Sequence, residues 1–154
     1  MLDFLLELKD ENITSLEGVE NCKNLKNLSF KNLNVTDFSK IKDLTNVKEI
    51  SFENLNKDAD ISAISELTNL EKIRFENLKL NKYPNSLSKL TKLKEITMRN
   101  TNFKNVSSLK NLTNLEMLII KGQGVYGSYN EKGCLLYTSP SPRDLSTSRM
   151  PSSA

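Results

Sequence analysis

Residues 87–98 have the sequence LSKLTKLKEITM, and residues 109–118 have the sequence LKNLTNLEML. In these two stretches Leu93 and Leu115 each begin the same spacing of apolar residues. That spacing also begins at Leu25, Val47 and Leu70, so it recurs every 22 or 23 residues. A period of this length is typical of repeat proteins, in which each unit packs only against its neighbours. The sequence therefore predicts a solenoid.

Each unit places apolar residues at its first, fourth and sixth positions. The fourth and sixth positions mostly flank one polar residue, which is the period of a strand with one buried face. In the second half of the unit, apolar residues such as Val35, Phe38 and Ile41 come every third position, which suits a short 3₁₀ or helical turn. The five triplets are Leu25, Leu28, Phe30; Val47, Ile50, Phe52; Leu70, Ile73, Phe75; Leu93, Ile96, Met98; and Leu115, Leu118, Ile120. We predict that these side chains, including the phenylalanines, form a stacked core.

This pattern resembles the leucine-rich repeat, and most closely the class with about 22 residues per unit that occurs in bacterial internalins and related regulatory proteins. The resemblance covers about residues 2–125. It implies an α/β leucine-rich repeat solenoid, with parallel strands on the concave face and short 3₁₀ or helical return segments. We expect the repeat domain to span residues 1–125, with about five full repeats and a partial one, followed by a breakdown of the repeat over residues 126–133.

The asparagines depart from the family pattern by one position. The family places asparagine at the ninth position, with its side chain directed inward, whereas this chain has Glu11, Leu33, Leu55, Leu78 and Thr101 there. Its asparagines stand one place earlier, at Asn32, Asn54, Asn77 and Asn100. A shift of one residue at the end of a strand changes the direction of a side chain. The sequence leaves open whether these asparagines face inward or outward.

Residues 134–154, CLLYTSPSPRDLSTSRMPSSA, lose the repeat and contain three of the four prolines. On composition this is a Ser/Pro-rich disordered segment. It also resembles the translation of a transposase-based sequencing adapter, which implies a non-native tail on a fragment of a longer protein. Without the tail, the net charge falls from +3 to about +2, and this balance does not indicate a nucleic-acid partner.

Candidate catalytic and metal-ligating residues are scarce. The chain contains no histidine, which removes Ser-His and Cys-His pairs and most zinc sites. Cys22 takes the place of the leucines at 44, 67, 90 and 112, so we predict a small buried hydrophobic residue there. We therefore predict no enzyme activity, no cofactor and no metal site. No stretch approaches the roughly 20 apolar residues of a membrane-spanning helix.

The outward positions of the strands are the candidate binding surface. Equivalent residues of stacked strands form rows about 4.8 Å apart across the concave face. The seventh position carries basic residues at both ends of the row and acidic residues in its middle. These charges form either lateral ion pairs on a solvated face, each contributing roughly 0–1 kcal/mol, or part of a surface that binds a protein. The candidate residues are Lys31, Glu53, Arg74, Glu76, Thr97, Arg99, Met117, Ile119 and Lys121.

Two functions remain open for a repeat domain of this class. The first is a protein-binding module of a larger bacterial surface or secreted protein, similar to an internalin. The alternative is an intracellular regulatory scaffold that holds an enzyme partner. The sequence contains no signal that decides the localisation, and it does not identify the partner.

Overall fold

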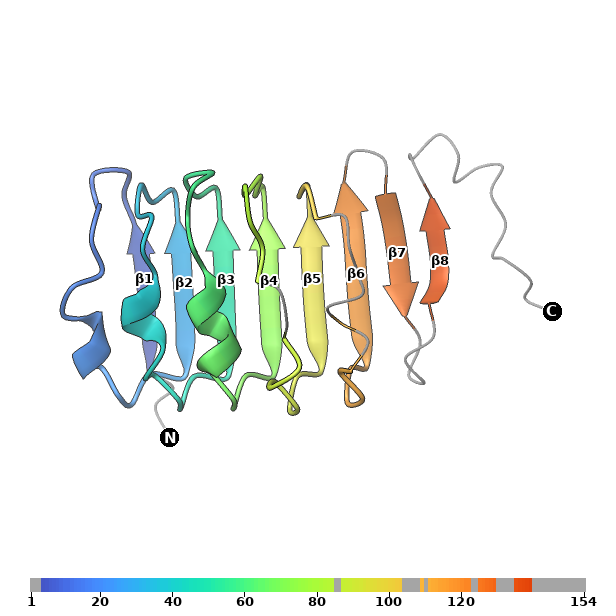
Figure 1. Cartoon of the computed structure of the whole chain (residues 1–154), viewed down its shortest axis with the longest axis horizontal. Coiled ribbons are helices and arrows are strands. Elements are labelled where there is room, and N and C mark those ends of the chain that lie inside the picture. The colour runs from blue at the N-terminus through green and yellow to red at the C-terminus, as the bar shows by residue number, and fades with distance from the viewer. Residues whose placement is uncertain are drawn as a thin grey trace.

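The fold is a single row of strands stacked along the long axis of the molecule (Figure 1). The computed structural model describes residues 4–84, 87–103, 109, 111–122, 125–129 and 135–139. Over these residues eight strands form one sheet in the order β1 to β8. The strands are β1 (Leu5–Lys9), β2 (Asn27–Lys31), β3 (Glu49–Glu53), β4 (Lys72–Glu76), β5 (Glu95–Arg99), β6 (Met117–Gly122), β7 (Val125–Tyr129) and β8 (Leu135–Ser139).

The first six strands are parallel, and their register follows the sequence repeat. Leu28 pairs with Ile50, and Ile50 pairs with Ile73, so equivalent positions of successive repeats lie side by side. β7 then pairs antiparallel with β6, and β8 pairs antiparallel with β7. The parallel part of the sheet is the leucine-rich repeat solenoid that the period predicts.

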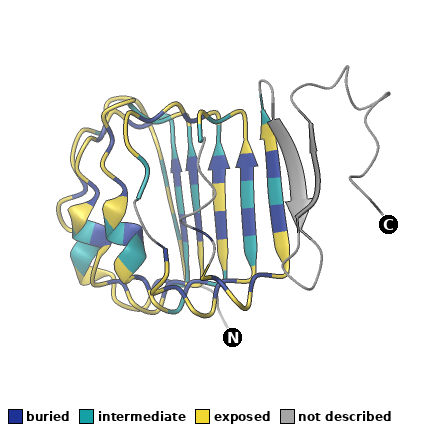
Figure 2. Ribbon diagram, turned by 45° about the vertical axis from the view of Figure 1, so that its right-hand side comes forward, coloured by how far each residue is buried: buried dark blue, intermediate teal, exposed yellow. Residues whose placement is uncertain are grey.

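The core lies on one face of this sheet. All fifteen residues of the five predicted triplets are buried, which confirms the predicted phase of the strands. Phe30 stacks on Phe52 with ring centroids 5.6 Å apart, and Phe52 stacks on Phe75 at 5.9 Å. Figure 2 shows the result as dark blue, buried positions alternating with lighter ones along β2 to β6. The phenylalanine row is therefore part of the core.

The return segments cover the buried face. Three short 3₁₀ helices occur among the described residues: η1 (Val19–Asn21), η2 (Ser39–Ile41) and η3 (Ser62–Glu66). The Oδ1 atom of Asp37 accepts a hydrogen bond of 2.8 Å from the backbone N–H of Ser39, and Asp60 does the same for Ser62 at 2.9 Å. These turns hold the chain at the start of η2 and η3. The opposite face of the sheet carries no return segment among the described residues (Figure 2), and we call it the open face.

The shifted asparagines face outward. Asn32, Asn54, Asn77 and Asn100 follow their strands with φ angles of 54°, 49°, 50° and 50°. In this left-handed conformation, which asparagine tolerates better than most residues, each side chain turns away from the core. Leu33 and Leu78, at the ninth position, are buried instead, so leucine fills the inward place where the family has asparagine.

A second set of asparagines links the repeats at the amino-terminal ends of the strands. The side-chain amides of Asn46, Asn69 and Asn114 donate to the backbone carbonyls of Lys23, Thr45 and Thr91 in the preceding repeat, at 2.8, 2.6 and 2.5 Å. These bonds satisfy carbonyls that the strands leave unpaired. The LTN triplets at 44–46, 67–69 and 112–114 are the sequence signal for this role, which was not predicted.

One expectation from the sequence does not hold. Cys22 is exposed, so the prediction of a buried hydrophobic residue is wrong. Cys22 follows η1, which contacts only η2 among the described helices, whereas Leu44 follows η2, which contacts both η1 and η3. Leu135–Ser139 form β8, and the expectation of a non-native, disordered tail over residues 134–154 stays a prediction. Residues 130–134 and 140–154 lie outside the described part.

Candidate functional site

The open face consists of three rows of side chains that run across the strands. The rows come from the third, fifth and seventh positions of each repeat, and every one of these residues on β2 to β6 is half-buried or exposed. The strand pleat explains this, because residues between the buried fourth and sixth positions must point to the other face. All nine predicted site residues lie in these rows.

A shallow groove of about 500 Å³ lies over the first five strands of this face. It brings together five of the predicted site residues, Lys31, Glu53, Arg74, Glu76 and Thr97. Arg99, Met117, Ile119 and Lys121 do not line the groove and lie farther along the face, on β5 and β6. The groove also contains polar residues that the sequence analysis did not select: Glu7, Asn27, Ser29, Glu49, Ser51, Lys72 and Glu95.

Two sets of charges on the open face are paired laterally. Lys31 Nζ lies 2.8 Å from Glu53 Oε1, with about a third of each side chain exposed. The hydrogen bond from Lys31 to Glu53 raises the pKa of the Lys31 ammonium group, and the negative charges of Glu53, Glu76 and Glu7 add to this effect. In the row formed by the third positions of the repeats, Lys72 Nζ lies 3.7 Å from carboxylate oxygens of both Glu49 and Glu95. For Lys31 and Glu53 the pairing interpretation therefore holds.

The other predicted cations of the open face are Arg74, Arg99 and Lys121. Among the described residues, Arg74, Arg99 and Lys121 form no ion pair, although Glu76 and Arg99 are in register on adjacent strands. All three side chains are exposed. Met117 and Ile119 lie beside them on β6; Met117 is 41% exposed and Ile119 is half-buried. This end of the open face presents positive charge and apolar surface to solvent.

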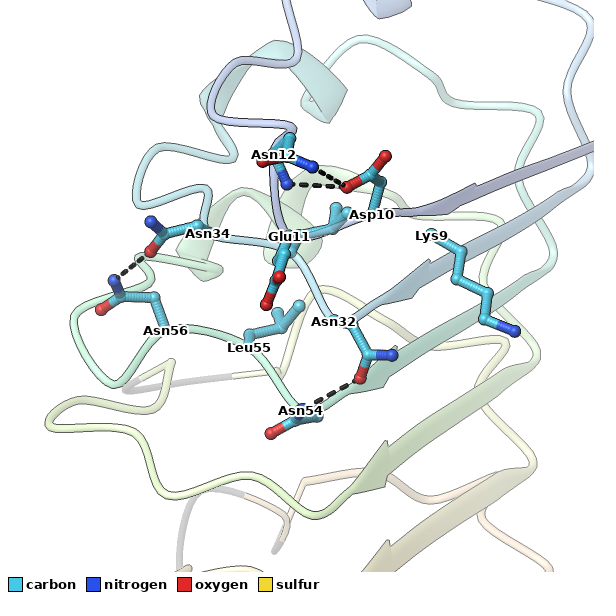
Figure 3. A pocket seen from close by; sticks show the side chains of 10 residues that line it. Lys9, Asp10, Glu11, Asn12, Asn32, Asn34, Asn54, Leu55 and Asn56 are labelled. Atoms are coloured by element: carbon cyan, nitrogen blue, oxygen red, sulfur yellow. Dashed lines mark hydrogen bonds between the residues drawn. The ribbon is translucent and has the colours of Figure 1, made fainter.

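A second hollow, of about 820 Å³, lies beside the carboxyl ends of β1, β2 and β3 (Figure 3). Its polar groups mostly bond to one another. The amide of Asn54 donates to Asn32 Oδ1 at 2.9 Å, and the amide of Asn56 donates to Asn34 Oδ1 at 2.7 Å. Because these groups already have partners within the wall, the open face is the better candidate for a binding surface. Its lining residues are Lys9, Asp10, Glu11, Asn12, Asn32, Leu33, Asn34, Asn54, Leu55 and Asn56.

Two other kinds of feature do not occur among the described residues. In the described part of the chain, no three cysteine, histidine or acidic residues gather closely enough to hold a metal ion. No helix of the described residues is long and apolar enough to span a bilayer.

Comparison with known proteins agrees with the fold. A family model described as the leucine-rich repeat domain of the endo-β-N-acetylglucosaminidase EndoS matches residues 2–98. No curated protein matches the chain. Among solved structures, an internalin (inlF) of Listeria monocytogenes is similar with 25% identity and a TM-score of 0.50. An internalin C2 (inlC2) of the same species is similar with 23% identity and a TM-score of 0.49.

These structures are longer than the matched region. The match to inlF covers 77% of this chain and 42% of that protein, and the match to inlC2 covers 75% and 60%. The chain thus spans less than two thirds of either internalin. What the similarity establishes is a repeat module with an internalin-like fold, of a kind that typically serves for binding.

Proposed function

We propose that this chain, which belongs to the leucine-rich repeat family named after the repeat domain of EndoS, is a module that binds a protein partner on its open face. EndoS itself is named as an enzyme, but the matched family model describes its leucine-rich repeat domain. The binding function proposed here is that of the repeat domain alone. We further propose that the module is non-enzymatic and is a fragment of a larger bacterial surface or secreted protein. The similarity to an internalin supports this parentage.

The main support for the proposal is that the two faces of the sheet carry different kinds of side chains. The core and the return segments occupy one face completely, while the other leaves three rows of polar, charged and apolar side chains open over successive strands. Parallel stacking holds these rows at a fixed spacing without any contribution from the exposed side chains. Such a face can accept substitutions that suit a partner, because the fold does not depend on them.

Site-specific photo-cross-linking tests this proposal. A benzophenone amino acid replaces Ser51 or Thr97 on the open face, or Lys42 in a return segment as the matched control. Each variant is irradiated in bacterial lysate and in culture medium. We expect Ser51 and Thr97 to capture the same protein and Lys42 not to capture it. Capture from Lys42 alone, or unrelated proteins at Ser51 and Thr97, would contradict the assignment of the face.

The same experiment separates the two cellular settings. A partner recovered from the medium or from another cell's surface supports a surface or secreted parent. An enzyme recovered only from the lysate supports the intracellular regulatory scaffold instead, and leaves the binding function of the open face intact.

A further inference from the structure

The charge of the open face changes sign along the solenoid. On β1 to β3 the outward positions hold Lys9 and Lys31 against Glu7, Glu49 and Glu53. On β4 to β6 they hold Lys72, Arg74, Arg99 and Lys121 against Glu76 and Glu95. The first half of the face is therefore net acidic, and the second half is net basic.

The basic half also keeps its cations available. Lys72 lies between two carboxylates, but Arg74, Arg99 and Lys121 have no ion-pair partner among the described residues. They lie on three successive strands, about 4.8 Å apart in the stacking direction. An exposed cation without a partner gains most from an anion supplied by another molecule, and arginine binds carboxylates through two parallel hydrogen bonds.

Apolar surface lies next to these cations. Ile119 is in register with Thr97 and lies two residues before Lys121 on β6, and Lys121 is in register with Arg99, so Ile119 lies next to the positive charges. Met117 is in register with Glu95 and extends the apolar surface away from the cations. Met117 is one of three large hydrophobic residues that are strongly exposed in the described part of the chain. An apolar side chain that docks here would remove both residues from water, and such central anchors carry much of the affinity of protein interfaces.

We propose that the β4–β6 end of the open face, centred on Arg74, Arg99, Lys121, Met117 and Ile119, binds an acidic segment of the partner protein that carries an apolar anchor residue. This inference rests on the proposed function and specifies the partner's chemistry. The carboxylates of the segment pair with the three cations, and its apolar side chain packs on Met117 and Ile119. The charge gradient orients the segment, because the acidic β1–β3 end repels it.

Synthetic peptides test this chemistry on the full chain. The probes are a fluorescein-labelled peptide with alternating glutamate and leucine, a second with glutamate and serine, and a third with lysine and leucine. Fluorescence anisotropy should show the tightest binding for the glutamate-leucine peptide and about tenfold weaker binding for the glutamate-serine peptide. The lysine-leucine peptide should not bind this end, and added salt should weaken the glutamate-leucine complex.

Two charge-reversal variants locate the site. R74E/R99E/K121E should abolish binding of the glutamate-leucine peptide. K42E/K57E/K79E makes the same change in charge at exposed residues off the open face, and it should leave the affinity within about twofold. M117S/I119S should weaken binding about tenfold. Because all of these residues are exposed or half-buried, circular dichroism should show an unchanged fold for each variant.

Several results would overturn the inference: no binding of the glutamate-leucine peptide, equal binding of the lysine-leucine peptide, or equal losses in the two triple variants. An oligonucleotide that binds as tightly as the acidic peptide would reveal a general polyanion site and would also overturn it.

Capture of a partner from Ser51 and Thr97 through a segment that is not acidic would refute this inference and leave the proposed function standing. If neither Ser51 nor Thr97 captures a protein, the proposed function fails, and the claim about a segment of the partner fails with it, even if the peptide binds.

Discussion

The side-chain amide of Asn54 donates a hydrogen bond of 2.9 Å to Asn32 Oδ1, and both residues have left-handed backbone conformations directly after their strands. Asn100 and Asn77 repeat this relationship at the same distance, one repeat apart. The asparagines thus do two things at once. They end each strand with a positive φ, and they join successive repeats on the outside of the solenoid.

The first prediction concerns this backbone conformation. Asn54→Ala should lower the free energy of unfolding by about 1–2 kcal/mol, because alanine at positive φ is strained and the amide bond is lost. Asn54→Gly also loses the bond, but it carries no strain and should be less destabilising. Urea unfolding followed by circular dichroism measures both variants. If glycine destabilises the protein as much as alanine, the left-handed conformation is not what selects asparagine.

Tyr83 provides a prediction about pH. Burial raises the pKa of its phenol from 10.0 to about 12, and a hydrogen bond with Thr101 partly opposes this shift. The ring contacts Phe103 edge-on at 5.2 Å, and its hydroxyl donates to the carbonyl of Leu78. A raised pKa in the folded state means that this stabilisation is complete below pH 10 and is lost as the pH rises toward about 12.

The comparison of the wild type with Tyr83→Phe measures this effect. The wild type should lose stability more steeply than Tyr83→Phe between pH 10 and about 12, as followed by urea midpoints at each pH. Lysine titration affects both proteins equally, so the difference reports Tyr83. Identical slopes for the two proteins would show that the phenol titrates as it does in water.

Cys22 provides a direct test of its exposure. In a Cys134→Ser background the native protein should react with Ellman's reagent at one thiol, at a rate close to that of the urea-unfolded protein. A Cys22→Leu substitution should leave stability nearly unchanged, because the added apolar side chain stays in water. A thiol that reacts only after unfolding would restore the buried interpretation.

The sequence predicts those features of the structure that depend on residue spacing, but not those that depend on backbone angles. The phase of the strands follows from spacing alone, so residues such as Ile73 and Phe75 could be assigned to the core without a structure. The direction of Asn54 depends on a backbone angle that spacing does not contain. The tolerance of asparagine for positive φ, at the first residue after each strand, was the available signal.

The candidate site was only partly predictable for a related reason. Spacing places Glu76 beside Arg99 as surely as it places Lys31 beside Glu53, yet only the second pair forms an ion pair among the described residues. Pairing depends on the conformations that these long, flexible side chains adopt. Exposed ion pairs differ little in free energy from separated charges, so spacing alone does not decide which pair forms. Which cations of the open face lack an ion-pair partner among the described residues therefore became visible only in the structure.

The central claim is that side chains on one face of the sheet stabilise the fold, whereas those on the open face contact the partner. Two adjacent residues of β4 test this claim. Ile73 is 2% exposed in the core, and Arg74 is exposed on the open face. Chemical unfolding of Ile73→Asp and Arg74→Ala, each against the wild type, measures the difference directly. We predict that Ile73→Asp abolishes cooperative unfolding, because it buries an unpaired charge. Arg74→Ala should leave the transition within about 0.5 kcal/mol of the wild type. Equal destabilisation by the two substitutions would contradict the assignment of the faces.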